Sequence, residues 1–240
     1  MTIPANLNQA LQEALEEVRS DPSHQLGPAT RATLYKIFPE IDTPVANLAR
    51  RWLAVLAGKY VLPLWSPPDY EKYHYPPQPE DFPEELVTQT AADYALELAE
   101  KVIMGEATAE FGSHVAGEAW VGLGYCMPLP SMLAEIAANI ALSEACNQDF
   151  SRWEIDILIK QAQNPASRFS RIDAAITAAH AFACYLDPEQ VAPDAWPEGW
   201  NWWVKKEEPL DPSRLLTYWE WWLTEAFPEA WRLAEEMITS

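Results

Sequence analysis

Apolar residues recur along this chain at the three- and four-residue spacing of an amphipathic helix. The first example lies near the start, where one helical face carries Leu7, Leu11, Leu15 and Val18. The same periodicity predicts helices over 29–38, 44–63, 83–104, 150–163 and 172–186, and another that begins at Pro130 or Ser131. Because the alternating pattern of strands is absent, we expect an all-α protein, a multi-helix bundle or irregular helical array of about 8–10 helices.

Local signals mark several helix ends. Thr43 and Asp211 each precede a proline, the order typical of a capping side chain followed by the first helical residue. Gly105 stands where a glycine commonly follows the end of a helix. Pro228 is expected to divide the last two helices, because proline cannot continue the hydrogen bonding of a helix interior.

Residues 1–240 are expected to form a single all-α domain with one proline-rich interruption. This segment, 66–83, has six prolines and four aromatic residues. Because proline cannot continue a helix, we expect an ordered loop whose rings pack onto the helices, and the alternative is a lid or a strap that binds a partner. A Trp-rich helical segment is expected at 196–238.

Charge narrows the classes of partner. The chain has 36 acidic and 16 basic residues, a formal net charge of −20. Nucleic acids and anionic membranes are not expected partners, because binding a polyanion needs clustered basic side chains. A basic protein, in contrast, is attracted to such a chain. The most apolar stretch, 119–129, is too short to span a bilayer.

The cysteines and the N-terminus bear on location. Cys126, Cys146 and Cys184 lack the spacing of metal ligands and are expected to be reduced thiols in the core. The first twenty residues are amphipathic and acidic, unlike a signal peptide. Together these features predict a cytoplasmic protein.

One pair of polar residues has the spacing of a site. His114 and Glu118 lie four residues apart and would share one face of a helix. Two ligands are fewer than a metal site needs, and no nucleophile accompanies the pair. A structural pair is therefore the leading interpretation, with a metal site or a general base as the alternatives. The sequence predicts no catalytic residue, no bound metal and no cofactor.

The remaining polar and small residues are expected to be structural. His180 is interpreted as a core histidine, and the polar face of the helix that begins near Pro130 is expected to meet water through Glu135, Asn139 and Glu144. Two basic groups are expected to neutralise internal carboxylates: Arg50, Arg51, Lys59 and Lys72, and Arg152, Lys160, Arg168 and Arg171. The glycines of 105–124 lack the pattern of a phosphate-binding loop and are expected to let a neighbouring helix approach.

Tryptophans concentrate near the end of the sequence, with eight of the twelve between Trp196 and Trp231. The helix over this region is apolar around most of its circumference, which predicts that it is surrounded by protein. One row of its residues is therefore expected to be buried: Leu215, Trp219, Trp222 and Ala226. Other tryptophans are expected to line a cleft or face a partner, because tryptophan is favoured at interface hot spots. The candidate binding residues are Trp196, Trp200, Trp202, Trp203 and Trp221, together with His114 and Glu118.

The segment RRWLAVLAGKYVLPLW, at 50–65, is similar to the helix that opens the family-five immunity-protein-like domain of bacterial polymorphic toxin systems. Gly105, the small-residue helix around His114 and the alanine-rich stretch IDAAITAAHAFA fit the same pattern, so the resemblance covers roughly 50–186. The resemblance implies a mostly helical, non-catalytic cytoplasmic domain that neutralises a toxin. It places no toxin-contacting residue on this chain, and the segment 66–83 departs from the compact family pattern.

Three functional hypotheses follow from the sequence. The first is an acidic helical binding protein, immunity-like, whose partner is a basic toxin. The second is a small-molecule-binding or enzymatic helical bundle with a Trp-lined pocket. The third is a structural subunit of a homo-oligomer that buries the Trp-rich segment against its own copy.

Overall fold

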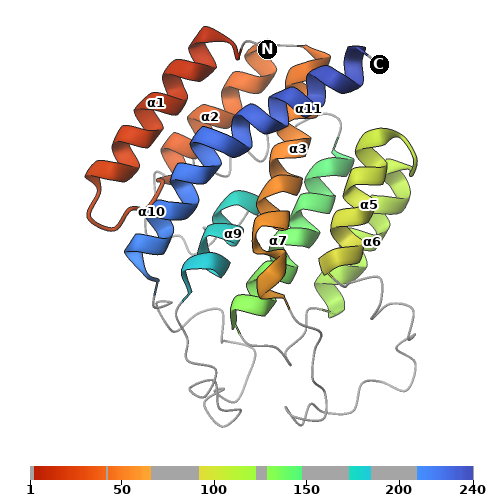
Figure 1. Ribbon diagram of the computed structural model, residues 1–240. Coiled ribbons are helices and arrows are strands. Elements are labelled where there is room, and N and C mark those ends of the chain that lie inside the picture. Colours follow the sequence, from red (N-terminus) through yellow and green to blue (C-terminus); the bar gives the residue numbers. More distant parts are fainter. Residues whose placement is uncertain are drawn as a thin grey trace, which may run out of the picture.

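The computed structural model describes residues 3–41, 43–65, 92–122, 129–147, 173–184 and 210–239. These residues form an all-α helical array, as predicted (Figure 1). The α-helices are α1 (Ala5–Ser20), α2 (Pro28–Ile41), α3 (Pro44–Val61), α5 (Ala92–Met104), α6 (Ala109–Gly122), α7 (Leu129–Cys146), α9 (Ala174–Ala183), α10 (Pro212–Trp221) and α11 (Phe227–Thr239). The expectations for 66–83 and 150–163 lie outside the described residues.

The described residues contain no strand. An isolated antiparallel bridge joins Cys184 to Leu210, and it brings the end of α9 beside the start of α10. None of the described helices is both long enough and apolar enough to cross a membrane.

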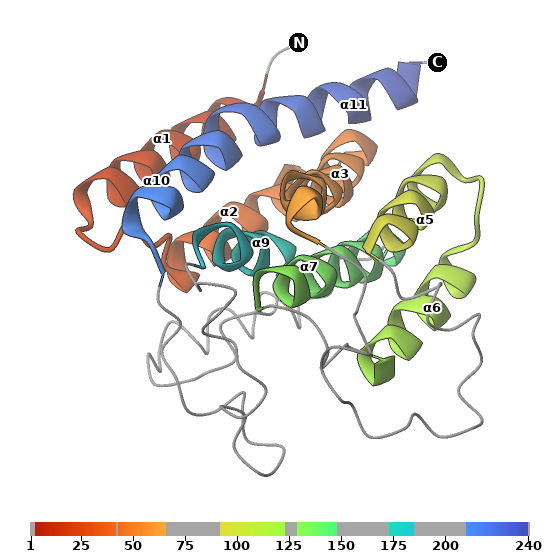
Figure 2. The same cartoon turned by 60° about the horizontal axis from the view of Figure 1, so that its bottom comes forward.

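The helices pack in layers around α3 and α7. In Figure 2, α10 and α11 follow one line across one side of the molecule, with α1 beside α10. Helix α11 packs on α3, and α3 packs on α7, which also contacts α5, α6 and α9. All residues of 131–142 are buried, so α7 lies in the core along this stretch.

The local boundary signals act as predicted. Thr43 accepts a hydrogen bond from the backbone N–H of Ala46 at 3.1 Å and caps α3. Asp211 accepts one from the backbone N–H of Ser213 at 2.8 Å at the start of α10. Gly105 follows α5 with a φ of 76°, a conformation that only glycine adopts without strain.

The expectation at Pro228 is wrong. A π-helical turn, η5 (Trp222–Ala226), joins α10 to α11, so the helix continues through the proline. The N–H of Phe227 donates to the carbonyl of Trp222, five residues earlier. This wider turn accommodates the proline, which has no N–H to donate.

Candidate functional site

The structure separates the predicted site residues. His114 is an exposed residue of α6, and Trp221 is the partly exposed last residue of α10. Helices α6 and α10 lie on opposite sides of the molecule (Figure 1), so His114 and Trp221 belong to different surfaces. The backbone of Glu118 lies in α6, and its side chain is outside the description. The other candidates, Trp196, Trp200, Trp202 and Trp203, lie outside the described residues.

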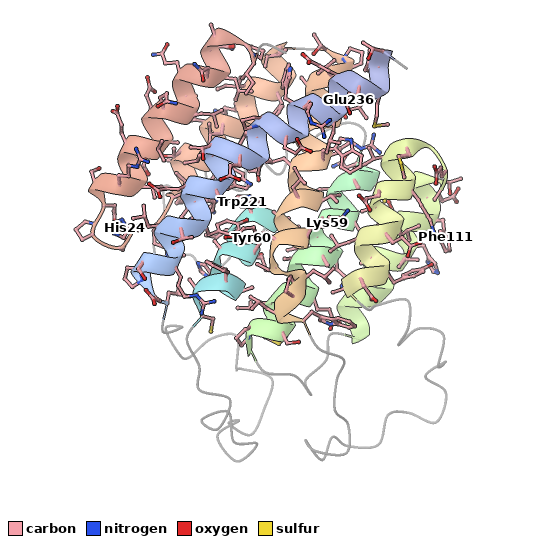
Figure 3. The ribbon with its side chains drawn as sticks, in the orientation of Figure 1. His24, Lys59, Tyr60, Phe111, Trp221 and Glu236 are labelled. Carbon is pink, nitrogen blue, oxygen red and sulfur yellow. The ribbon has the colours of Figure 1, made fainter. Side chains whose placement is uncertain are left out.

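Trp221 belongs to a group of aromatic side chains from α3, α9 and α10, which we call the Tyr60 cluster. Its members are the rings of Tyr60, Phe182, Tyr218 and Trp221, together with the guanidinium of Arg214 that lies over Phe182. The rings of Tyr60 and Trp221 stack with centroids 4.0 Å apart and an interplanar angle of 29°. Figure 3 shows these two side chains next to each other between α3 and the end of α10.

Further contacts hold the Tyr60 ring in place. Phe182 and Tyr218 meet it edge to face, with centroids 5.2 and 5.4 Å away. At the Phe182 end of the cluster, the guanidinium carbon of Arg214 lies 4.6 Å from the ring centroid of Phe182, a cation–π contact. Tyr218 is fully buried, whereas Tyr60, Phe182 and Trp221 are half-buried. The cluster is thus an aromatic surface whose rings are fixed from beneath.

Two charges of opposite sign act on this surface. Burial and the negative charge of Glu225 raise the pKa of Tyr60, and the positive charge of Arg214 opposes them. The Tyr60 phenol therefore stays protonated at neutral pH and remains a hydrogen-bond donor. Glu225 is exposed on η5, one turn beyond Trp221. The arrangement suits binding more than proton transfer.

Most tryptophans of the C-terminal helices are core residues, as predicted. Trp219 and Trp222 are fully buried, and Trp231 is 5% exposed. Leu215 and Ala226, which were predicted to form one buried row with Trp219 and Trp222, are buried as well. These rings hold α10, η5 and α11 against the rest of the protein.

The polar face predicted for α7 is wrong. Glu135, Asn139 and Glu144 are 3%, 2% and 4% exposed, so they do not meet water. The side chain of Glu135 accepts a hydrogen bond from the indole N–H of Trp65 at 3.2 Å, and burial raises its pKa to about 7. The side chain of Glu144 accepts one from the backbone N–H of Ala174, at the start of α9.

The basic residues of α3 were predicted to neutralise carboxylates, and only part of that prediction holds. Arg50 and Arg51 are buried and donate to backbone carbonyls near the end of α7, Asn147 at 2.6 Å and Ala145 at 2.6 Å. A cation at a helix C-terminus offsets the partial negative charge of the last carbonyls. Lys59 pairs with the carboxylate of Glu100 at 2.5 Å, as expected. Lys72 and the second basic group lie outside the described residues.

The remaining candidates divide between core and surface. His180 is buried in α9, as predicted. Cys146 and Cys184 are buried, and neither forms a disulfide bond within the described part of the chain, whereas Cys126 lies outside the description. Among the described residues, no group of three or more histidine, cysteine and acidic side chains has the arrangement of a metal site.

Sequence reasoning found Trp221 and missed the residues around it. Tyr60 lies on the apolar stripe predicted for the helix over 44–63, and nothing in its spacing distinguishes it from a core residue. Phe182 and Arg214 come from two other helices, so no motif links them to Trp221. No protein-family model and no curated protein sequence matches this chain.

Proposed function

We propose that this protein is a non-catalytic, acidic helical binding protein whose partner is a basic protein. In the form suggested by the immunity-protein resemblance, the partner is a toxin that the protein neutralises in the cytoplasm. The proposal rests on the distribution of surface charge, together with the half-buried aromatic rings of the Tyr60 cluster.

The charge distribution carries the argument. Among the described residues, most exposed cations are already used within the chain: Arg19 pairs with Glu220, Lys59 with Glu100, Lys101 with Glu97, and Arg232 with Glu229 and Glu236. Exposed carboxylates in the same part of the chain form no ion pair: Glu13, Glu16, Asp93, Glu106, Glu110 and Glu225.

This imbalance leaves a surface that attracts positive charge. Complementary charge speeds the encounter of two proteins and suppresses wrong partners. Half-buried tryptophan and tyrosine then supply the rigid contact area that is typical of interface hot spots. The function is therefore proposed to be recognition of a cationic protein surface.

The test has two steps: the immobilised protein is used to capture a partner, and the rate of their association is then measured. The protein is immobilised, and what it retains from a lysate of its source organism is identified by mass spectrometry. The retained protein is then purified, and its association rate is measured across a salt series. We expect a basic protein whose association slows steeply with added salt, because salt screens electrostatic steering. A partner that is not basic, or an association rate unchanged by salt, would contradict the proposal.

A further inference from the structure

We infer that the outer surface of Trp221, between Tyr60 and Glu225, seats an arginine side chain of the basic partner. This inference rests on the proposed function, because it names where and how a cationic partner is held. It follows from a difference between the two ends of the Tyr60 cluster.

One end of the cluster already carries a cation. The Arg214 guanidinium lies over Phe182, and Phe182 in turn meets the edge of Tyr60. Arg214 is half-buried and belongs to α10, so this cation–π contact is part of the fold.

At the other end of the cluster, Trp221 also offers an aromatic face, but no cation occupies it within the described part of the chain. The adjacent carboxylate, Glu225, is exposed and forms no ion pair within the described part of the chain. Glu225 lies on η5, four residues beyond Trp221, and its negative charge acts on the Tyr60 phenol. A π face next to an uncompensated carboxylate is a complementary surface for a positive charge.

The geometry favours arginine over lysine. The Trp221 ring is planar, and a planar guanidinium can stack on such a face while its N–H groups reach a neighbouring carboxylate. An ammonium group is strongly hydrated and cannot bind a carboxylate in the two-point manner of arginine. The stack is also held by Phe182 and Tyr218, so little side-chain entropy is lost when a ligand binds.

The experiment is a fluorine NMR titration of protein that contains fluorotryptophan. The probe is a hexapeptide in which arginine and glycine alternate, and the comparison peptides carry lysine or uncharged citrulline in place of arginine. Trp221→Phe identifies the Trp221 signal. Glu225→Gln removes the carboxylate. Glu106→Gln is the matched control, because Glu106, at the turn between α5 and α6, is an exposed carboxylate that forms no ion pair with any described residue.

We expect the arginine peptide to shift the Trp221 signal saturably, and Glu225→Gln to raise the Kd by about threefold to tenfold. The Kd of the Glu106→Gln variant should stay near the wild-type value. The thermal unfolding midpoints of both variants should also stay near that of the wild type. An unmoved Trp221 signal overturns the inference. So does a citrulline or lysine peptide that binds as well as the arginine peptide.

The result also separates this inference from the proposed function. If the retained basic partner binds with a salt-dependent rate but leaves Trp221 unmoved, recognition occurs on another surface and only the inference fails. If no basic partner is found, a saturable shift by the arginine peptide still supports the seat at Trp221.

Discussion

Arg31 and Asp173 form a buried ion pair that joins α2 to the start of α9 across 142 positions of sequence. The Arg31 Nε lies 3.0 Å from Oδ2 of Asp173, and the two side chains are 2% and 8% exposed. The other oxygen of Asp173 accepts the backbone N–H of Ile176 at 2.9 Å and caps α9. One carboxylate therefore both balances a buried cation and begins a core helix.

Removal of the cation from this pair should be strongly destabilising. Arg31→Met leaves the Asp173 carboxylate buried without its partner, so we expect the free energy of unfolding to fall by about 3 to 5 kcal/mol. Equilibrium unfolding in urea measures this change. Arg19→Met is the matched control, because the Arg19–Glu220 pair is largely exposed and should contribute less than about 1 kcal/mol.

A double variant tests the cause. Asp173→Asn keeps an oxygen for the cap of α9 but removes the charge, so in the Arg31→Met background it should recover part of the loss. Equal losses for Arg31→Met and Arg19→Met would mean that the buried pair contributes no more than the exposed one.

Two glycines of α6 should respond in opposite directions to the same substitution. A Cβ on Gly112 would collide with the Sγ of Cys146 and lie 3.1 Å from a methyl group of Val102, so Gly112→Ala should cost about 1 to 3 kcal/mol. Gly117 is exposed, and no atom of the described residues lies within 4 Å of an added Cβ, so Gly117→Ala should stabilise by about 0.5 to 1 kcal/mol.

Thermal and urea unfolding of the two variants give the comparison directly. The expectation that glycines let a neighbouring helix approach thus holds for Gly112 and not for Gly117. A stabilising Gly112→Ala would show that α6 and α7 can separate at little cost.

The hydroxyl of Tyr218 should be dispensable for stability. It is fully buried and has no hydrogen-bond partner among the described residues, and burial raises the pKa of this phenol well above its usual range. Because an unsatisfied buried hydroxyl costs free energy, Tyr218→Phe should leave stability unchanged or raise it by about 1 kcal/mol. Urea unfolding at neutral pH measures the difference.

Thr177→Val is the control for this prediction, because the buried hydroxyl of Thr177 donates to the carbonyl of Asp173 at 3.1 Å. Its loss should cost about 1 kcal/mol. A large loss in Tyr218→Phe would indicate that a water molecule or another acceptor satisfies the phenol in solution.

The helix boundaries were predictable because their signals act within one turn. Thr43 binds an N–H three residues away, and Gly105 needs only its own backbone freedom. Pro228 was misjudged because a π turn can precede a proline, and no residue type signals that choice.

The buried charges were not predictable, because sequence periodicity does not say what covers a helix face. Glu135 and Glu144 lie in an alanine-rich stretch that is equally compatible with a solvated side. Their hydrogen-bond partners are distant in the sequence: Trp65 for Glu135, and the backbone N–H of Ala174 at the start of α9 for Glu144. The same reason explains why Trp221 was identified while Tyr60 was not.

Stability should fall as the pH rises through neutrality, because of Glu135. Burial raises the pKa of this carboxyl from 4.5 to about 7, so between these values the folded protein holds a proton that the unfolded chain has released. The stabilisation is complete below pH 4.5 and is lost as the pH passes 7, a change of about 3 kcal/mol. Glu135→Gln keeps an acceptor for the Trp65 indole but cannot ionise.

Urea unfolding of both proteins from pH 4 to pH 8 tests this expectation. The two should be equally stable at the acidic end, and Glu135→Gln should be the more stable by about 3 kcal/mol at the alkaline end. Glu97→Gln is the control, because Glu97 is exposed, its pKa is lowered by Lys101, and its loss should change stability only slightly. If wild type and Glu135→Gln follow the same pH profile, the Glu135 carboxylate is solvated in the folded protein, and the contact with Trp65 is not what buries it.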